Sequence, residues 1–378
     1  MSAFGPTVLG QACLLMTQSG HRVAASGVDS FCLSPSPTHR KVLGFDNCRG
    51  RRHMQRRQFI KVIAGSATAW PLAARAQHTL RRIGVLMPYA EHDPEAQGRA
   101  KVLEEALQNL GWTKNALRID YRWAGGDSER FQLHAAELVN LKEDAIVAVS
   151  TPAVKTLQRL TQNIPIVFTQ VSDPVSQGIV TNMARPARNV SGFTNYDPEI
   201  GGKWLGLLKE AIPSLLSATI IFNPETAPYA ALYLRAMEAV APSIAVKVTT
   251  SPVHTDAEIE EVFTKQSREQ GSGLIMPPDI FLSDRRKRFI ELAARFALPA
   301  MYPFRYFVVD GGLMSYGIDH TEQTRAAAGY IDRILKGENV GDLPVQTPTR
   351  FQLIVNLKTA KPFNVPTALL TRTDEVIE

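Results

Sequence analysis

The sequence predicts an α/β protein made of two Rossmann-like lobes, each with a parallel sheet. From Leu80 onward, short runs rich in Val and Ile alternate with amphipathic segments of 10 to 16 residues, which is the pattern of βα units. Most of the runs are apolar throughout, which indicates strands buried on both faces. About 300 residues follow this pattern, and a chain of that length usually divides into two domains.

The strands can be placed along the chain by their composition. Six continuous apolar runs are expected to form them: 83–87, 145–149, 164–168, 219–222, 273–276 and 299–302. Residues 117–123 instead alternate strictly between apolar and polar side chains, and residues 245–248 do so more weakly. Alternation is typical of a strand with one exposed face, so we expect these two nearer a sheet edge.

Apolar residues at helical spacing lie between the strands. They are Ala100, Leu103, Leu107 and Leu110; Phe131, Ala135 and Leu138; Phe289, Leu292, Ala293 and Phe296; and Ala327, Ile331, Ile334 and Leu335, with Lys336-Gly337 as a helix end. These stripes predict helix faces packed in the core rather than cofactor contacts. Arg285 to Arg288 begin one of these helices, and we interpret this basic cluster as a solvated helical face.

An export signal precedes the folded part. Arg56-Arg57 stand just before a short apolar run, and Ala74-Arg75-Ala76 is a small-x-small cleavage site, so residues 54–76 are expected to be a twin-arginine signal cleaved after Ala76. Gln55 and Ile60 depart from the usual twin-arginine pattern, which leaves general secretion open. The run is too short to span a bilayer.

Residues 1–53 lie ahead of that signal and show no sustained periodicity. We interpret them as a disordered upstream extension from a mis-assigned start codon, with Met54 as the start. They hold all three cysteines, Cys13, Cys32 and Cys48. The mature chain would therefore contain neither a disulfide nor a thiol nucleophile.

The basic charge belongs to the leader. Residues 1–77 hold 10 Lys and Arg against 2 Asp and Glu, which leaves 32 basic and 34 acidic residues and a net charge near −2. No basic patch interleaved with aromatics follows, so no nucleic-acid partner is expected.

Six predicted strands end in a proline beside polar or aromatic residues. The junctions are Met87-Pro88-Tyr89, Ser150-Thr151-Pro152, Ser172-Asp173-Pro174, Asn223-Pro224, Met276-Pro277-Pro278-Asp279 and Tyr302-Pro303-Phe304-Arg305. A single junction of this kind can be simply a good helix start. Six together favour a ligand cleft, because the carboxyl ends of parallel strands share one edge of a sheet.

Roles in that cleft follow from side-chain chemistry. Ser150, Thr151, Ser172, Asn223 and Pro278 belong to its junctions, Asp173 and Asp279 could accept from an ammonium or hydroxyl group, and Arg305 could clamp an anion. The aromatic residues expected to form its walls are Tyr89, Phe193, Tyr302, Phe304 and Tyr316.

Sequence patterns for catalysis are missing from the mature chain. His78, His92, His134, His254 and His320 are scattered without metal-ligand spacing, and neither a nucleophile elbow nor a P-loop is present. We therefore predict a binding protein rather than an enzyme, with no catalytic residue, metal or cofactor.

The chain resembles the family of ABC-transporter periplasmic substrate-binding proteins that includes the tryptophan/tyrosine-type proteins. The resemblance covers residues 82–378. It rests on IPIVF at 164–168, SDPV at 172–175, ARP at 184–186, NVSG at 189–192, LPAMY at 298–302, FR at 304–305, GGLMSYG at 311–317, ILKG at 334–337, PTRF at 348–351 and VNLKTA at 355–360.

This resemblance implies the type I periplasmic-binding-protein architecture, in which three chain crossings join the lobes. The crossings would lie at 192–201, 317–319 and 347–351. Lobe one would comprise residues 78–195 plus 318–347, and lobe two residues 196–317 plus 348–378.

The resemblance also implies a function. A monomeric protein in the periplasm would capture a small amino acid or organic acid between its lobes and deliver it to an ABC permease and its ATPase. A periplasmic sensory module that reports to a receptor kinase is the alternative. Neighbouring genes would discriminate the two, since transport needs a permease and an ATPase.

Overall fold

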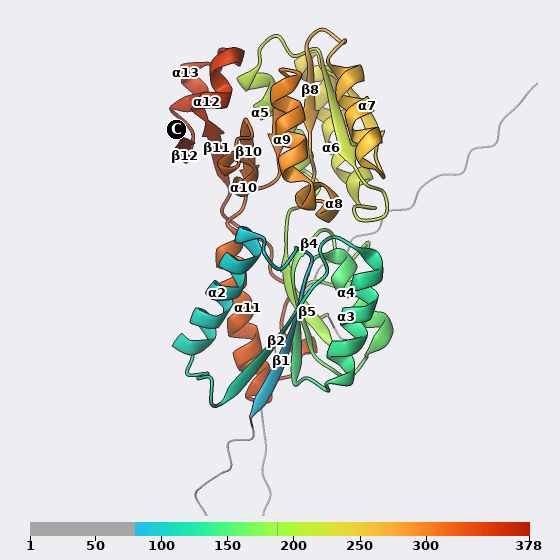
Figure 1. The fold of residues 1–378 in the computed structure, drawn as a ribbon, viewed down its shortest axis with the longest axis vertical. Coiled ribbons are helices and arrows are strands. Elements are labelled where there is room, and N and C mark those ends of the chain that lie inside the picture. Colours follow the sequence, from blue (N-terminus) through green and yellow to red (C-terminus); the bar gives the residue numbers. More distant parts are fainter. Residues whose placement is uncertain (1–79, 187) are drawn as a thin grey trace, which may run out of the picture. The chain divides into compact units, whose positions relative to one another are not determined.

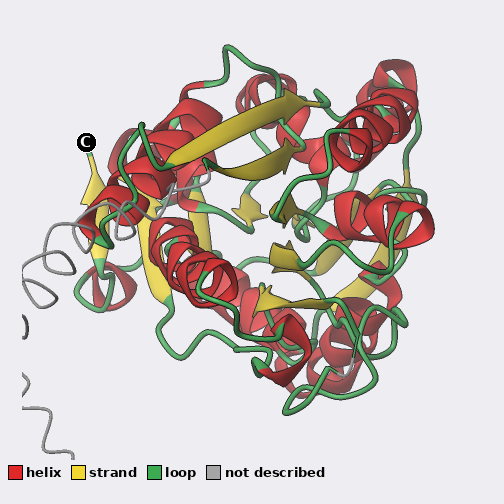
Figure 2. Cartoon of the chain, turned by 90° about the horizontal axis from the view of Figure 1, so that it is seen from below, coloured by secondary structure: helices red, strands yellow, loops and turns green. Residues whose placement is uncertain are grey.

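The computed structural model describes residues 80–186 and 188–378. These residues form two β-sheets, one with the strand order β2-β1-β3-β4-β5 and one with the order β12-β11-β10-β9-β8-β6-β7. Helices lie on both sides of the strands (Figure 2). The predicted α/β fold with parallel sheets is confirmed. The leader, the proposed start at Met54 and the three cysteines lie outside the described residues.

The first sheet is parallel throughout. Its strands are β1 (Arg81–Met87), β2 (Leu117–Trp123), β3 (Ala145–Val149), β4 (Ile166–Val171) and β5 (Val190–Thr194), and its helices are α2 (Pro94–Asn109), α3 (Ser128–Asn140), α4 (Thr151–Leu160) and α11 (His320–Leu335), followed by the 3₁₀ turn η2 (Val340–Asp342).

Alternate residues of β1 supply the two cores of this sheet. Ile83 and Val85 belong to the cluster that holds the apolar stripes of α2 and α11. Leu86 belongs to the cluster with α3 and α4 on the opposite face. Successive strand side chains point to opposite faces, so both faces are buried, as continuous apolar runs require. Figure 1 shows α2 beside α11, and α3 beside α4.

The second sheet is parallel except for the antiparallel pair of β10 and β11. Its strands are β6 (Ser217–Phe222), β7 (Lys247–Pro252), β8 (Ser272–Ile275), β9 (Ala300–Tyr302), β10 (Met314–Gly317), β11 (Gln352–Asn356) and β12 (Glu375–Ile377). Its helices are α5 (Ile200–Ala211), α6 (Ala230–Val240), α7 (Asp256–Gln266), α8 (Ile280–Asp284), α9 (Arg286–Arg295), α10 (Arg305–Val309), α12 (Leu357–Ala360) and α13 (Thr367–Leu370), with the 3₁₀ turns η1 (Ala241–Ile244) and η3 (Lys361–Phe363).

Both sheets repeat one topology. In β2-β1-β3-β4-β5 and in β7-β6-β8-β9-β10, the second strand of the unit is at the edge and the first lies beside the third. Open sheets of this order bind ligands at the carboxyl ends of their strands. Each sheet therefore offers one rim of loops for a ligand.

The chain passes between the sheets three times. Residues 195–199 lead from β5 to α5, residues 318–319 lead from β10 to α11, and residues 347–351 lead from Gln346, which bridges to Phe193, to β11. That these passages act as hinges, and that 78–195 plus 318–347 and 196–317 plus 348–378 move as lobes, stay predictions.

Two predicted edge strands are confirmed, since β2 and β7 both lie at sheet edges. The start of β7 differs from the expected 245–248, because Ala245 has a left-handed φ of 52° that ends η1. Gly192 was expected in a crossing, but it lies within β5 with a φ of 155°. A Cβ there would approach the carbonyl oxygen of Phe168 to 2.1 Å, so close strand packing is what requires this glycine.

None of the helices in the described part of the chain is long and apolar enough to cross a membrane.

Candidate functional site

Backbone strain gathers at the ends of β3 and β4. Ser150 has a φ of 98° and a ψ of 156°, a region that side chains rarely tolerate, and Gln170 and Asp173 also have positive φ. Gln170 lies where the pairing of β4 with β5 shifts register. Such strain persists only where the surroundings enforce it, and it tends to cluster at binding sites.

Three of the predicted site residues meet at this point. Ser150, Thr151 and Ser172 are at most 3% exposed, and the N–H of Ser172 donates to Thr151 Oγ1 (3.4 Å). Ser150 precedes α4, yet its side chain caps no N–H of that helix, and Ser150 Oγ has no partner among residues 80–186 and 188–378. A buried hydroxyl therefore lies free beside a helix N-terminus, which favours an anionic or polar group.

Two tyrosines that follow the second sheet's β6 close over these residues. Tyr233 donates from its hydroxyl to Ser172 Oγ (3.0 Å), and Tyr229 donates to the carbonyl of Pro278 (2.9 Å). Burial raises the pKa of both phenols, while contacts with Ser172 and Thr151 oppose the shift for Tyr229. Tyr233 therefore joins the loop ends of the two sheets through a neutral hydroxyl donor, while Tyr229 is bound to Pro278 within the second sheet.

The predicted residues of the second sheet form a brace. Asp279 is 3% exposed and accepts from the N–H of Asn223 (2.7 Å), from Thr226 Oγ1 (2.5 Å) and from the N–H of Phe281 (2.8 Å). Burial raises the pKa of Asp279 to about 6, although these donors oppose the shift. Asn223 Oδ1 in turn accepts from the N–H groups of Glu225 and Thr226. The brace fixes Pro278, the acceptor for Tyr229.

A second buried group surrounds Arg99 of α2. The guanidinium carbon lies 5.1 Å from the centre of the Tyr89 ring, which follows β1, and 5.9 Å from the centre of the Tyr306 ring of α10. Tyr89 donates to Gln170 Oε1 (3.1 Å) and Tyr306 to Ser283 Oγ (3.0 Å). Phe304 stacks on Tyr306 at 5.3 Å. Arg99 is therefore enclosed by aromatic rings from both sheets.

His320 lies at the edge of this group. Its ring is 4.7 Å from that of Phe304, and its Nε2 is 3.2 Å from Asn195 Oδ1. Burial lowers the pKa of His320 well below its usual value, and the charge of Arg99 adds to this effect. His320 is thus a neutral, buried histidine.

Arg286 also connects the two sheets. It donates to Asp93 Oδ2 (2.5 Å) at the start of α2 and to Asp310 Oδ2 (2.7 Å) after α10. Its side chain is only 7% exposed. The prediction of a solvated face was therefore wrong for Arg286, although Arg285 and Arg288 do form exposed ion pairs with Asp256 and Glu260.

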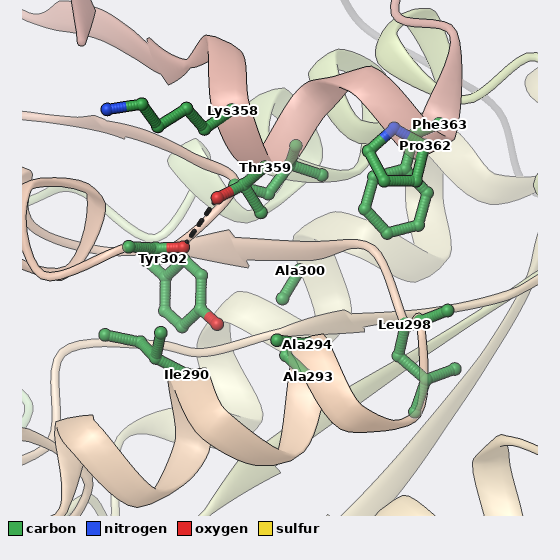
Figure 3. A pocket seen from close by; sticks show the side chains of 14 residues that line it. Ile290, Ala293, Ala294, Leu298, Ala300, Tyr302, Lys358, Thr359, Pro362 and Phe363 are labelled. Carbon is green, nitrogen blue, oxygen red and sulfur yellow. Dashed lines mark hydrogen bonds between the residues drawn. The ribbon is translucent and has the colours of Figure 1, made fainter. Parts of the chain in front are cut away.

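Tyr302 lies in a separate cavity of about 300 Å³ within the second sheet's layers. Figure 3 shows Ala293 and Ala294 of α9 on one side of this cavity and Pro362 and Phe363 of η3 on the other. The Tyr302 ring stacks on Phe307 at 5.0 Å, and its hydroxyl has no partner within the described ranges. The structure therefore does not bring Tyr302 to the loop ends.

Four further predicted residues take other places. Phe193 packs on Tyr330 in the core of the first sheet, and Tyr316 stacks on Phe351. Asp173 accepts from the N–H and the hydroxyl of Ser176. Arg305, half exposed, makes a two-pronged ion pair with Glu375, which raises its pKa. Arg305 lines a cavity of about 350 Å³ whose wall includes Glu95, Tyr306 and His320.

Sequence reasoning missed Arg99 and the tyrosines Tyr229, Tyr233 and Tyr306. A signal for Arg99 was present, because it interrupts the apolar face formed by Ala96, Ala100 and Leu103. An arginine on a core-facing stripe needs a buried partner. The tyrosines carry no such signal, since an aromatic residue on a helix is ordinary core material.

Comparison with known proteins places these features in context. The model of a family described as "ABC transporter substrate binding protein" matches residues 82–377. A curated relative, the "Tyrosine-binding protein" of Clostridioides difficile (strain R20291), is 26% identical over 283 residues, which are 74% of this chain and 80% of that protein.

Solved structures share the fold. The ABC domain from Streptococcus pneumonia in complex with L-Trp has a TM-score of 0.72 at 22% identity, over 79% of this chain and 99% of that one. A conserved domain protein from Vibrio cholerae has the same score and coverage at 24% identity. The ligand-free, open structure of a substrate binding protein with adhesive properties from Clostridium difficile scores 0.59 at 25% identity, again with 79% and 99% covered.

Proposed function

Because the chain belongs to the family of ABC transporter substrate-binding proteins, we propose that it captures a small amino acid or organic acid between the rims of its two sheets and delivers it to an ABC permease. The ligand would contact Ser150, Thr151 and Ser172 from one rim and Tyr229 and Tyr233 from the other. The named ligands of the relatives, tyrosine and L-Trp, are the natural first candidates.

One observation carries this proposal. Ser150 Oγ is buried at the start of α4 and has no partner in the described part of the chain, while Tyr233 from the other sheet donates to Ser172 at the end of the adjacent strand. An unsatisfied buried hydroxyl destabilises the free protein, and a ligand that completes its hydrogen bonding recovers that free energy. Backbone strain at Ser150 also supports a ligand site at this position, because strained residues concentrate where ligands bind.

Export and partners complete the proposed role. Family membership supports a protein that works outside the cytoplasm, and the twin-arginine signal at 54–76 with cleavage after Ala76 would take it to the periplasm as a monomer. The permease and its ATPase would then supply the transport energy, so the chain itself needs only to bind, close and release.

A thermal-shift screen tests capture. The purified protein is heated with each of the twenty amino acids and with a set of small aromatic and aliphatic acids. A compound that binds only the folded state raises the melting temperature by mass action. For the best compound, Ser150→Ala should weaken binding about 5- to 30-fold, the value of one or two lost hydrogen bonds.

The matched control is Ser191→Ala, a buried serine in β5 whose hydroxyl donates to the carbonyl of Leu343 (2.7 Å). This change should lower the melting temperature of the free protein but leave ligand affinity within about threefold, since Ser191 is remote from the rims. A screen without any stabilising compound would refute capture. A hit whose uptake is unchanged in cells that lack the gene would refute the transport role.

A further inference from the structure

Arg99 is a buried arginine whose terminal nitrogens have no hydrogen-bond acceptor in the described chain. It is 2% exposed, and its Nε donates to Glu95 Oε1 (2.9 Å). Both terminal nitrogens, Nη1 and Nη2, are buried without a hydrogen-bond partner anywhere in residues 80–186 or 188–378. A guanidinium keeps its charge in proteins and presents its donors in a rigid fork. Buried charged donors of this kind demand an acceptor.

The two aromatic neighbours of Arg99 do not supply the missing acceptor. Tyr89 and Tyr306 lie near the guanidinium from the two sheets, and both of their hydroxyls already donate to protein oxygens. Aromatic rings favour contact with a cation but cannot satisfy its N–H groups. The edge of the fork is therefore the part that still needs an oxygen.

A cavity of about 350 Å³ lies next to this group. Glu95, Tyr306 and His320 line it together with Asp319 and Glu375, and Glu95 and Tyr306 contact Arg99 directly, but Arg99 itself is not part of its wall. Near neutral pH His320 stays neutral, so it does not compete with Arg99 for an anion. The cavity is large enough for a small organic ligand.

Other arginines near this point are already paired with carboxylates. Arg286, whose guanidinium carbon lies 5.3 Å from the Tyr306 ring centre, binds Asp93 and Asp310. Arg305, in the same cavity wall, binds Glu375 through two nitrogens. Arg99 is also paired, with Glu95 through its Nε, but of these three it alone keeps both terminal nitrogens without a partner within the described chain.

We propose that Arg99 binds the carboxylate of the transported ligand through its two terminal nitrogens, with the ligand's apolar part against the rings of Tyr89 and Tyr306. This inference rests on the proposed capture function and adds to it the residue that recognises the ligand's carboxylate. Two parallel N–H···O bonds suit the planar geometry of both groups. Arg99, rather than Arg305, is thus the anion clamp.

Matched compounds test the requirement for a carboxylate. L-tyrosine is compared with L-tyrosinamide and tyramine, L-tryptophan with tryptamine, and 3-phenylpropionate and benzoate with their primary amides, each by thermal shift on the purified full chain. The acids should raise the melting temperature, and their amides and amines should not. An amide that stabilises as well as its acid overturns the assignment.

Variants of Arg99 test the residue itself. Arg99→Gln should weaken binding of the best acid by about 100-fold or more, because a buried charge pair is lost. Arg99→Lys keeps the charge but loses the fork of two terminal nitrogens, so its affinity for the acid should lie between those of Arg99→Gln and the wild type. If Arg99→Gln does not fold, Arg99→Lys provides the test. Arg333→Gln is the control, because Arg333 forms an exposed ion pair with Glu338 outside this cavity, and it should keep affinity within about threefold.

The outcomes separate the two proposals. If a neutral compound stabilises the wild type, or if both Arg99 variants bind an acid as the wild type does, Arg99 is hydrated rather than ligand-binding and only this inference fails. If no compound of any charge stabilises the protein, the capture function fails with it.

Discussion

The acidic residue Glu143 should make the stability of the protein fall as the pH rises from 4.5 to 7. Glu143 lies between α3 and β3, its side chain is fully buried, and neither carboxylate oxygen has a hydrogen-bond partner among the residues described. Arg82 approaches it only to 3.7 Å, and Arg82 is also bound to Asp120. Burial raises the pKa of Glu143 to about 7, against the opposing charge of Arg82.

The sign and size of this effect on stability follow from the pKa of Glu143 in the unfolded chain and its pKa in the folded protein. Below pH 4.5 Glu143 is protonated in both the folded and the unfolded chain, and it has no pH-dependent effect. Between pH 4.5 and 7 the unfolded chain loses this proton while the folded protein keeps it, so the free energy of unfolding decreases with pH. The difference of about 2.5 between the two pKa values corresponds to a decrease of about 3 kcal/mol at most in the free energy of unfolding.

Glu143→Gln removes this titration and leaves a neutral side chain of the same shape. The variant should be more stable than the wild type at pH 8 by about 1–3 kcal/mol, and the two should converge near pH 4.5. The assay is urea unfolding of both proteins at steps between pH 4.5 and 8.

The control is Glu137→Gln, which should show the opposite trend. The hydrogen bond from Arg122 lowers the pKa of Glu137, so its ionised form stabilises the fold and the variant should be less stable at neutral pH. A stability difference for Glu143→Gln that is constant across the pH range, or that grows toward low pH, would refute the reasoning.

Three further changes probe the fold, the brace and export. Gly192→Ala should lower the free energy of unfolding by about 3 kcal/mol or more, because a Cβ would meet the Phe168 carbonyl at a positive φ. The control is Gly206→Ala, in open space on α5, which should leave the free energy of unfolding unchanged or raise it in the same urea unfolding experiment. Asp279→Ala should lower the free energy of unfolding by about 2–4 kcal/mol, since Asn223, Thr226 and Phe281 lose their acceptor. A variant that unfolds at the same temperature as the wild type would contradict a stabilising role for Asp279. Replacing Arg56 and Arg57 together by lysine should retain the uncleaved chain in the cytoplasm, and cell fractionation that finds it mature in the periplasm would assign export to general secretion.

Much of the fold could be predicted from local pattern. Continuous apolar runs identified the central strands, and strict alternation at 117–123 identified the edge strand β2, because burial on one or two faces sets composition directly. The strands β5, β10, β11 and β12 were missed. β10 has four residues and β12 has three, which leaves little pattern to detect, and β11 pairs antiparallel to β10, so it does not continue the repeat of parallel units.

The site was predicted less well, for a physical reason. Ser150, Thr151 and Ser172 of the candidate site lie at strand ends, which a proline after small polar residues marks in the sequence. Arg99 and Tyr233 lie inside helices, and their roles depend on which distant segments fold against them. Tyr302 follows the same strand-end pattern, yet its side chain turns into the cavity of Figure 3.

A crystal structure of the protein with its co-purified ligand tests the central claim most directly. The account predicts density for one small molecule that touches Ser150 and Ser172 on one rim and Tyr233 on the other, with a carboxylate at Arg99. Density confined to the cavity beside Tyr302, with the two rims free of ligand, would contradict it.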